Sequence, residues 1–236
     1  MRRLYRTLLI GLVAGLVGIS LPACLENNEN APEDALPGLN ADGVVLIAYA
    51  NSTPVGAADI LCSGVTVGDL VVTAAHCLGS GRPLRVILDP VDLCDGTPER
   101  GTAITEAWVR PENGADIAVV QVDLSRPRTP PARPQSATWA ATGWGTSAGE
   151  AGRCTSRTVE LQATSGCASG ESALCATGIG SNTCSGDSGS GVVDSQGRVI
   201  AITSSGSSCR QGAPGVYAKV ASLESWFEGQ GLSLAR

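Results

Sequence analysis

Apolar residues recur along this chain in short runs whose length is typical of β-strands. Ten such runs lie at 44–49, 65–67, 70–72, 84–88, 117–120, 140–142, 158–161, 191–193, 199–203 and 215–219. Many are bounded by Gly, Asp, Pro or Ser, the residues that end strands in tight turns. Only 223–227, near the end of the sequence, has the pattern of a helix. The pattern therefore predicts an all-β fold with one short helix near its end.

A proline-rich stretch divides these runs into two sets. Residues 125–134 contain four prolines. Because proline cannot donate a ladder hydrogen bond and breaks helices, this stretch predicts an extended connection. The sequence thus indicates two all-β halves joined by a crossover.

Composition excludes several classes of protein. Of the 236 residues, 43% are hydrophobic and only 16% are charged, which excludes a disordered chain or a coiled coil. Acidic residues outnumber basic ones by 22 to 16, so the net charge is −6. An acidic chain has no electrostatic attraction to phosphate backbones, so we expect no nucleic-acid partner.

The first residues have the features of an export signal. Arg2, Arg3 and Arg6 precede an uncharged, mostly apolar run from Leu8 to Leu21. That run is shorter than the roughly 20 residues of a membrane-spanning helix, and it is typical of a signal peptide. Export would place the remaining chain where disulfides persist.

The signal ends in a sequence that resembles a bacterial lipoprotein box, Leu21-Pro22-Ala23-Cys24, although Pro22 is unusual there. In such a box the cysteine becomes the lipidated first residue, which predicts a cell-envelope lipoprotein anchored only through Cys24. Nine cysteines leave one unpaired, and residues 25–40 are rich in Asn, Glu and Pro, as a flexible tether is. The alternative is ordinary cleavage nearby and a secreted protein.

Three short motifs carry the candidate chemistry. The only histidine, His76, follows a predicted strand; Asp116 opens another; and Ser188 lies in the segment 184–190. A serine hydroxyl needs a base to act as a nucleophile, and imidazole has the appropriate basicity. A carboxylate then holds the imidazole in the correct tautomer. The order His, Asp, Ser favours one class of serine hydrolase over an α/β-hydrolase, whose histidine comes last.

These motifs are similar to those of trypsin/chymotrypsin-type serine proteases. The matching segments are Thr73-Ala74-Ala75-His76-Cys77, Asp116-Ile117-Ala118, Gly186-Asp187-Ser188-Gly189, Ala141-Thr142-Gly143-Trp144-Gly145 and Pro214-Gly215-Val216-Tyr217, with Trp226 in the terminal helix. After the nucleophile motif, Ser190-Gly191 replaces the usual Gly-Pro. The resemblance covers about residues 43–229.

The resemblance implies two six-stranded Greek-key β-barrels packed together, followed by a C-terminal helix. The expected segments are a signal peptide at 1–23, a flexible tether at 24–42, a first barrel at 43–124, a crossover at 125–136, a second barrel at 137–220 and a helix at 221–230.

The resemblance also implies the role of each site residue. His76 would take the proton of Ser188, Asp116 would orient His76, and Ser204 would donate a hydrogen bond to Asp116. The backbone N–H groups of Gly186 and Ser188 would form the oxyanion hole.

The same resemblance predicts a neutral specificity pocket. Its base corresponds to Asn182, followed by Thr183, and no carboxylate stands there. Gly206 and Gly215 occupy the wall positions and would leave the pocket open. The edge Ser204-Ser205-Gly206 would pair with an extended peptide backbone. We expect a peptide or protein substrate with a medium or large uncharged side chain in this pocket. We also expect the protein to be a monomer.

The cysteines fit the same family. By resemblance, Cys62 pairs with Cys77, Cys167 with Cys175 and Cys184 with Cys209; Cys94 and Cys154 remain and are predicted to join the two halves. With a single histidine and no Cys-x-x-Cys, we expect no metal site and no cofactor.

Activation is where the sequence departs most from the family. In most members a new Ile-Val-Gly-Gly amino terminus inserts beside the aspartate that precedes the nucleophile, here Asp187. No such sequence precedes Val44, and no Lys or Arg lies between Arg6 and Arg82. Three possibilities follow. Another protease cuts the chain near residues 36–40, the fold is active without cleavage, or Asp187 lacks a partner and the oxyanion hole is not formed. Two functions follow: an active exported endopeptidase, or a protease-like lipoprotein that binds partners without turnover.

Overall fold

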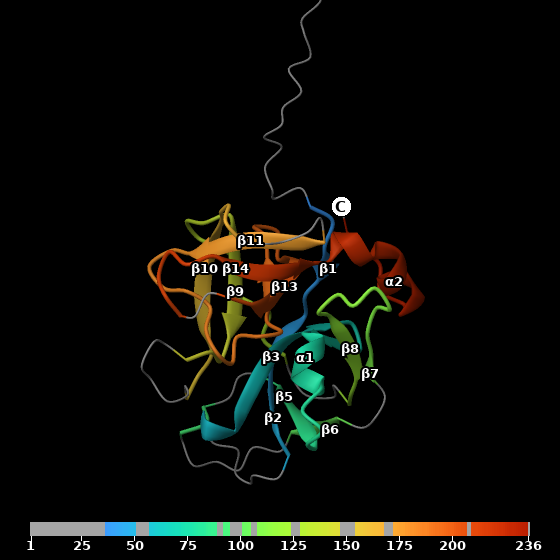
Figure 1. The fold of residues 1–236 in the computed structure, drawn as a ribbon. Coiled ribbons are helices and arrows are strands. Elements are labelled where there is room, and N and C mark those ends of the chain that lie inside the picture. The colour runs from blue at the N-terminus through green and yellow to red at the C-terminus, as the bar shows by residue number, and fades with distance from the viewer. Residues whose placement is uncertain are drawn as a thin grey trace, which may run out of the picture. The chain divides into compact units, whose positions relative to one another are not determined.

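The computed structural model describes residues 36–50, 57–88, 92–94, 101–104, 108–123, 128–146, 154–167, 172–206 and 209–235 (Figure 1). The predicted signal sequence, Cys24 and most of the predicted tether lie outside these residues. The strands are β1 (Leu39–Asn40), β2 (Gly43–Tyr49), β3 (Ile60–Val67), β4 (Leu70–Thr73), β5 (Leu84–Leu88), β6 (Thr102–Ile104), β7 (Trp108–Val109), β8 (Ala118–Gln121), β9 (Trp139–Gly143), β10 (Arg157–Ala163), β11 (Ala173–Gly178), β12 (Gly191–Val193), β13 (Arg198–Ser205) and β14 (Gly215–Lys219). The helices are η2 (Ala57–Asp59), α1 (Ala75–Leu78), η3 (Ala221–Leu223) and α2 (Glu224–Gly229).

The second half of the chain forms a closed barrel. Its strands follow the order β1-β13-β12-β9-β10-β11-β14, and β14 also pairs with β13, so six strands form a ring with β1 added outside it. The interior contains Trp139, Leu161, Ile200 and Tyr217, all essentially inaccessible to solvent. Closure leaves few free strand edges, and the strands are held as a rigid frame.

The first half forms a seven-stranded antiparallel sheet in the order β6-β5-β2-β3-β4-β8-β7. Its core is built from β-branched residues such as Val45, Ile47, Val65 and Val72. The expected all-β, two-part class is confirmed, with one difference in this half. Among the described residues β6 and β7 are not paired with each other, so the sheet is a half-barrel.

The connection between the halves contacts both of them. Thr129 accepts a hydrogen bond from the N–H of Val44, and the N–H of Ala132 donates to the hydroxyl of Thr142. Residues 128–134 form neither helix nor strand, in line with the proline content of this stretch. In Figure 1 the two sheets lie one above the other, with α1 on the side of the first that faces the second.

Four strands, β1, β6, β7 and β11, have no counterpart among the predicted runs. Leu39 and Asn40, which we assigned to the tether, pair with Val199 and Arg198 of β13. Leu39 is fully buried, because its apolar side chain enters the core between the halves. Strand β11 was not predicted, since its Ala, Cys, Thr and Gly residues carry a weak strand signal; its ladders with β10 and β14 define it.

The end of the chain contains the expected helix. Helices η3 and α2 cover 221–229, where Phe227 is fully buried. Over the described residues, no helix has both the length and the apolar character needed to cross a membrane.

Four disulfide bonds join the cysteines that were expected to pair. They are Cys62–Cys77, Cys94–Cys154, Cys167–Cys175 and Cys184–Cys209. The second joins a loop of the first half to the segment before β10, and the backbone N–H of Leu93 donates to the carbonyl of Cys154 beside it. Eight of the nine cysteines are thereby paired.

Candidate active site

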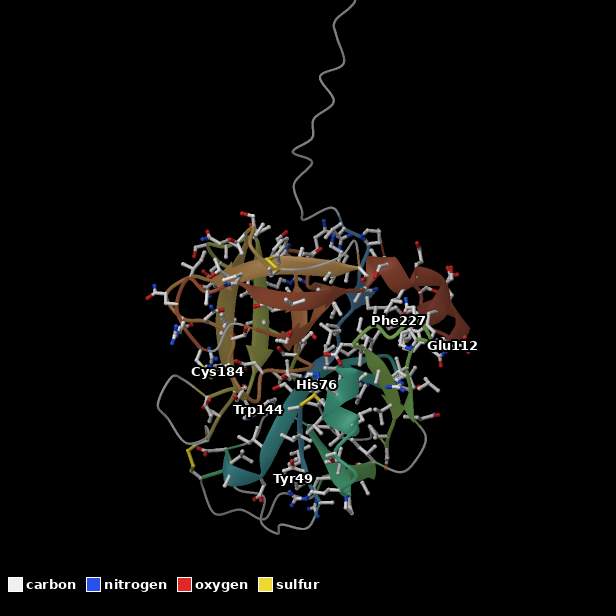
Figure 2. The ribbon with its side chains drawn as sticks, in the orientation of Figure 1. Tyr49, His76, Glu112, Trp144, Cys184 and Phe227 are labelled. Carbon is white, nitrogen blue, oxygen red and sulfur yellow. A yellow bond between two sulfur atoms is a disulfide. The ribbon has the colours of Figure 1, made fainter. Side chains whose placement is uncertain are left out.

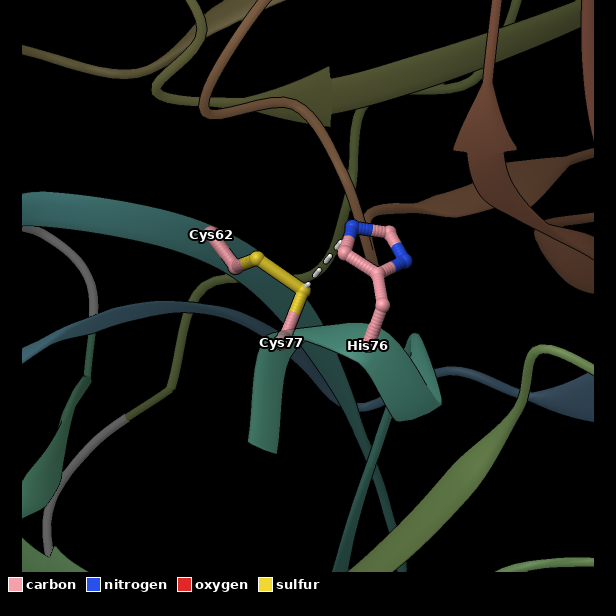
Figure 3. A group of neighbouring side chains, drawn as sticks. All are labelled: Cys62, His76 and Cys77. Carbon is pink, nitrogen blue, oxygen red and sulfur yellow. Dashed lines mark hydrogen bonds between the residues drawn. A yellow bond between two sulfur atoms is a disulfide. The ribbon is translucent and has the colours of Figure 1, made fainter. Parts of the chain in front are cut away.

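His76 lies in the one-turn helix α1, directly after β4. The disulfide between Cys62 of β3 and Cys77 fixes this turn to the sheet, and Figure 3 shows the disulfide beside the imidazole. The Sγ atom of Cys77 is 3.8 Å from His76 Nε2. The ring itself is half exposed, and Figure 2 places it on the face of the first sheet toward the second.

Asp116 holds His76 at two points. It precedes β8, and its Oδ2 lies 2.7 Å from His76 Nδ1 while its Oδ1 accepts the backbone N–H of His76 at 3.0 Å. A carboxylate can only accept, so Nδ1 carries the proton and the Nε2 lone pair is left to act as a base. From the second half, the hydroxyl of Ser204 donates to Asp116 Oδ2 at 2.6 Å.

The two groups shift each other's pKa in opposite directions. The hydrogen bond to Asp116 raises the pKa of His76 above 6.5, and the nearby negative charge adds to this against the effect of burial. Burial acts to raise the pKa of Asp116, but the hydrogen bonds from His76 and Ser204 outweigh it, so this pKa falls. The pair therefore consists of a carboxylate and a strengthened base.

Ser188 lies in a tight turn that follows Cys184. Within this turn the N–H of Asp187 donates to the carbonyl of Cys184, and the N–H of Gly189 donates to Thr203 of β13. Gly186 has a φ of +96°, which favours glycine. In the described part of the chain, no backbone carbonyl accepts from the N–H of Gly186 or Ser188.

Ser63 attaches this turn to the first half, a role that the sequence analysis missed. Its backbone N–H donates to the carbonyl of Ser188 at 2.8 Å, and its hydroxyl donates to the carbonyl of Gly186 at 2.8 Å. The same hydroxyl accepts the backbone N–H of Trp144 at 3.1 Å. A buried serine next to a disulfide cysteine carries no sequence signal for this role, because its partners are far away along the chain.

A cavity of about 320 Å³ opens beside Ser188. Its lining consists of Thr183, Cys184, Ser185, Ser188, Thr203, Ser204, Ser205, Gly206 and Cys209, none of which is charged. Since Ser204 also binds Asp116, the cavity adjoins the His76–Asp116 pair. The structure thus brings together most of the predicted site residues.

Two predicted pocket residues lie outside this lining. The side chain of Asn182 is buried: its Oδ1 accepts the N–H groups of Gly178 and Thr183, and its Nδ2 donates to Ala213. A Cβ on Gly215 would lie 2.9 Å from the hydroxyl of Tyr217, so this glycine allows close packing. The roles of Asn182 and Gly215 in substrate binding stay predictions.

Thr183, one of the lining residues, is hydrogen-bonded to a buried tyrosine. The hydroxyls of Thr183 and Tyr217 are 3.0 Å apart, and burial raises the pKa of Tyr217 to about 12. The tyrosine is therefore neutral over the range in which enzymes ordinarily work.

Arg157 of β10 is the second residue that the sequence analysis missed. Its Nη2 lies 2.6 Å from Oδ2 of Asp187, and both side chains are almost completely buried. A single arginine in a short strand is ordinarily a solvent-exposed residue, so no signal in the sequence pointed to this pair.

Candidate metal ligands come together twice among the described residues, as Cys62, His76 and Cys77 and as Asp92, Cys94 and Cys154. In each group both sulfurs belong to one disulfide. A metal-binding cysteine is a thiolate, so neither group is a metal site while its disulfide is intact.

Comparisons with known proteins agree with this geometry. The family model described as Trypsin matches residues 45–227. A trypsin of Saccharopolyspora erythraea is 32% identical over 186 residues, covering 67% of this chain and 82% of the relative. A trypsin of Sarcophaga bullata is 28% identical over 261 residues, covering 92% and 95%.

Among solved structures, mouse neuropsin, described as a serine protease expressed in the limbic system of the brain, has the same fold. The TM-score is 0.58 at 24% identity, covering 81% of this chain and 95% of that chain. The family match spans most of the chain and includes His76, Asp116 and Ser188. This chain therefore belongs to the trypsin family of serine proteases.

Proposed function

We propose that this protein is an active, exported serine endopeptidase whose catalytic triad is Ser188, His76 and Asp116. The observation that carries the proposal is the two-point hold of Asp116 on His76, completed by Ser204, beside a cavity that Ser188 lines. A carboxylate, a base with a raised pKa and a serine at one cavity are the parts that acyl transfer requires.

In this mechanism His76 Nε2 takes the proton of Ser188 as its oxygen attacks the substrate carbonyl. His76 then delivers the proton to the leaving amine, and water repeats the sequence on the acyl-enzyme. Asp116 stabilises the imidazolium that forms in each half of the reaction.

The oxyanion is proposed to bind the N–H groups of Gly186 and Ser188. Support comes from the turn geometry. The N–H groups of Asp187 and Gly189 donate to backbone carbonyls, whereas no backbone carbonyl in the described part of the chain accepts from those of Gly186 and Ser188. Each donor of this kind contributes about 3–4 kcal/mol to transition-state stabilisation.

The cavity favours an uncharged substrate side chain, because none of its lining residues is charged. Ser204, Ser205 and Gly206 are proposed to pair with the substrate backbone as an added strand. A library of fluorogenic peptides tests this specificity, and best turnover at Arg or Lys would overturn it.

Export and lipidation at Cys24 complete the proposal. The other eight cysteines are all in disulfides, a state that persists outside the reducing cytosol. Fractionation tests the anchor: the native chain is expected with membranes, and the Cys24→Ser variant in the soluble fraction. A native chain that is already soluble would favour ordinary signal cleavage and secretion.

The catalytic proposal is tested with a fluorophosphonate probe on the chain from residue 24 onward, carrying Cys24→Ser. We expect one label per chain, on Ser188, and none on the Ser188→Ala control. A folded chain that takes no label, whether intact or trimmed before Val44, would be the protease-like binding protein of the alternative.

A further inference from the structure

Asp187 is a buried carboxylate whose position governs the turn that carries Ser188. Its Oδ2 accepts the backbone N–H of Cys184 at 2.9 Å, and its Oδ1 accepts the N–H of Gly145 at 2.8 Å. Its own backbone N–H donates to the carbonyl of Cys184. Any movement of this carboxylate would therefore rotate the peptide units at 184–188, including those of the proposed oxyanion hole.

A buried carboxylate requires a cation, and Arg157 supplies it. Besides the 2.6 Å contact with Asp187, its Nη2 donates to the carbonyl of Asn182 at 2.9 Å, and its Nε donates to the carbonyl of Gly145 at 3.0 Å. The guanidinium thus connects β10, the 143–146 segment and the base of the nucleophile turn. Its planar set of donors suits this several-fold contact.

The space around Asp187 is closely filled. A Cβ on Gly145 would lie 2.1 Å from Cγ of Asp187, so even a methyl group has no room there. An amino terminus inserted at this carboxylate would have to displace Arg157.

The start of the described chain is held elsewhere. Gly38 exchanges backbone hydrogen bonds with Ala235 at 3.0 and 2.7 Å, and Leu39 pairs with Val199 of β13. Thr203, which binds the nucleophile turn, lies four residues after Val199 on β13. At the rise per residue of a β-strand, the two positions are about 13 Å apart.

We propose that Arg157 is a positioning residue that permanently replaces an inserted amino terminus. By holding Asp187 it keeps the oxyanion donors of Gly186 and Ser188 in place, so the enzyme is active without cleavage before Val44. This inference rests on the proposed function, and its test separates the two.

The first experiment needs no substitution in the site. The chain from residue 24, with Cys24→Ser and a short extension that blocks its amino terminus, is treated with the fluorophosphonate between pH 8 and 10. We expect complete labelling at a rate that does not fall across this range, because a guanidinium stays protonated where an α-amine of ordinary pKa near 8 loses its charge. Among the described residues, Tyr217 is a titratable group close to this pair: the charge of Asp187 contributes to its raised pKa of about 12, which keeps it neutral over this range.

The second experiment removes the guanidinium. Arg157→Met is expected to lower the labelling rate about 100-fold, the effect of losing an oxyanion donor, with Arg157→Lys in between. The matched control is Arg198→Met, which breaks another buried ion pair, with Asp194 at 2.7 Å, away from the nucleophile turn. The control is expected to keep the rate within threefold. The NMR resonance of the His76 Nδ1 proton verifies that each variant is folded with its triad intact.

The outcomes are distinct. Labelling of the parent chain only after its amino terminus is freed, or a rate that falls with a midpoint near pH 8, overturns the role of Arg157 and leaves the protease intact. A folded Arg157→Met variant that labels as fast as the parent does the same. A parent chain that never labels, blocked or trimmed, overturns the proposed function and this inference with it.

Discussion

Ser63 offers a quantitative test of how the two halves cooperate. In Ser63→Ala the hydroxyl is lost, and two buried groups lose their partner: the carbonyl of Gly186 and the backbone N–H of Trp144. An unsatisfied buried group costs about 1–3 kcal/mol. We therefore expect the free energy of unfolding to fall by roughly 2–6 kcal/mol.

The same substitution loosens the residue that is proposed to donate to the oxyanion. If about 1.4 kcal/mol of transition-state stabilisation is lost, kcat falls about tenfold. Stability is measured by guanidinium unfolding in a Ser188→Ala background, which prevents self-cleavage, and kcat is measured with Ser188 intact.

The control is Thr66→Val on the same strand. Thr66 is also buried, but its hydroxyl makes one long contact, 3.4 Å to the carbonyl of Gly43, away from the nucleophile turn. We expect a loss of about 1 kcal/mol or less and no change in kcat. If Ser63→Ala matches this control in both stability and kcat, the attachment of the turn through Ser63 is refuted.

Three further predictions concern the triad and the disulfides. Asp116→Asn is expected to lower kcat about 10,000-fold, because an amide does not enforce the tautomer of His76; a fall below tenfold would contradict the triad. The rate is expected to drop as pH falls through a midpoint above 6.5, since His76 must be neutral to accept a proton and its pKa is raised by Asp116; a pH–rate profile with a midpoint below 6.5 would contradict the geometry. Replacing Cys94 and Cys154 by serine opens a loop of 60 residues, which is expected to cost about 4 kcal/mol by loop entropy; an unchanged denaturation midpoint would count against it.

The strands with strong apolar patterns were predictable from local sequence. Strands β2, β5 and β14 coincide with their predicted runs to within one residue, because Val and Ile runs bounded by turn residues have few other stable arrangements. Strands β1 and β11 were not predictable in this way. Their residues are neither strongly apolar nor β-branched throughout, and they become strands only because β13, β10 and β14 offer free edges.

The residues of the candidate site also differ in whether the local sequence could predict their roles. Local motifs were sufficient to single out His76, Asp116 and Ser188, because a nucleophile, a base and a carboxylate are chemically distinctive residue types. The sequence also left the partner of Asp187 open and gave Ser63 no role. Both answers depend on hydrogen bonds between residues that are 30 and 123 positions apart.

The sequence alone therefore predicted the all-β class and the candidate catalytic residues, and it contains no Lys or Arg between Arg6 and Arg82. The tertiary structure decided the closure of the second barrel, the burial of Leu39 and the pairing of Arg157 with Asp187. The physical reason is range: strand propensity and chemical identity act over a few neighbouring residues, whereas the partner of a buried charge is set by which distant segments the fold brings together.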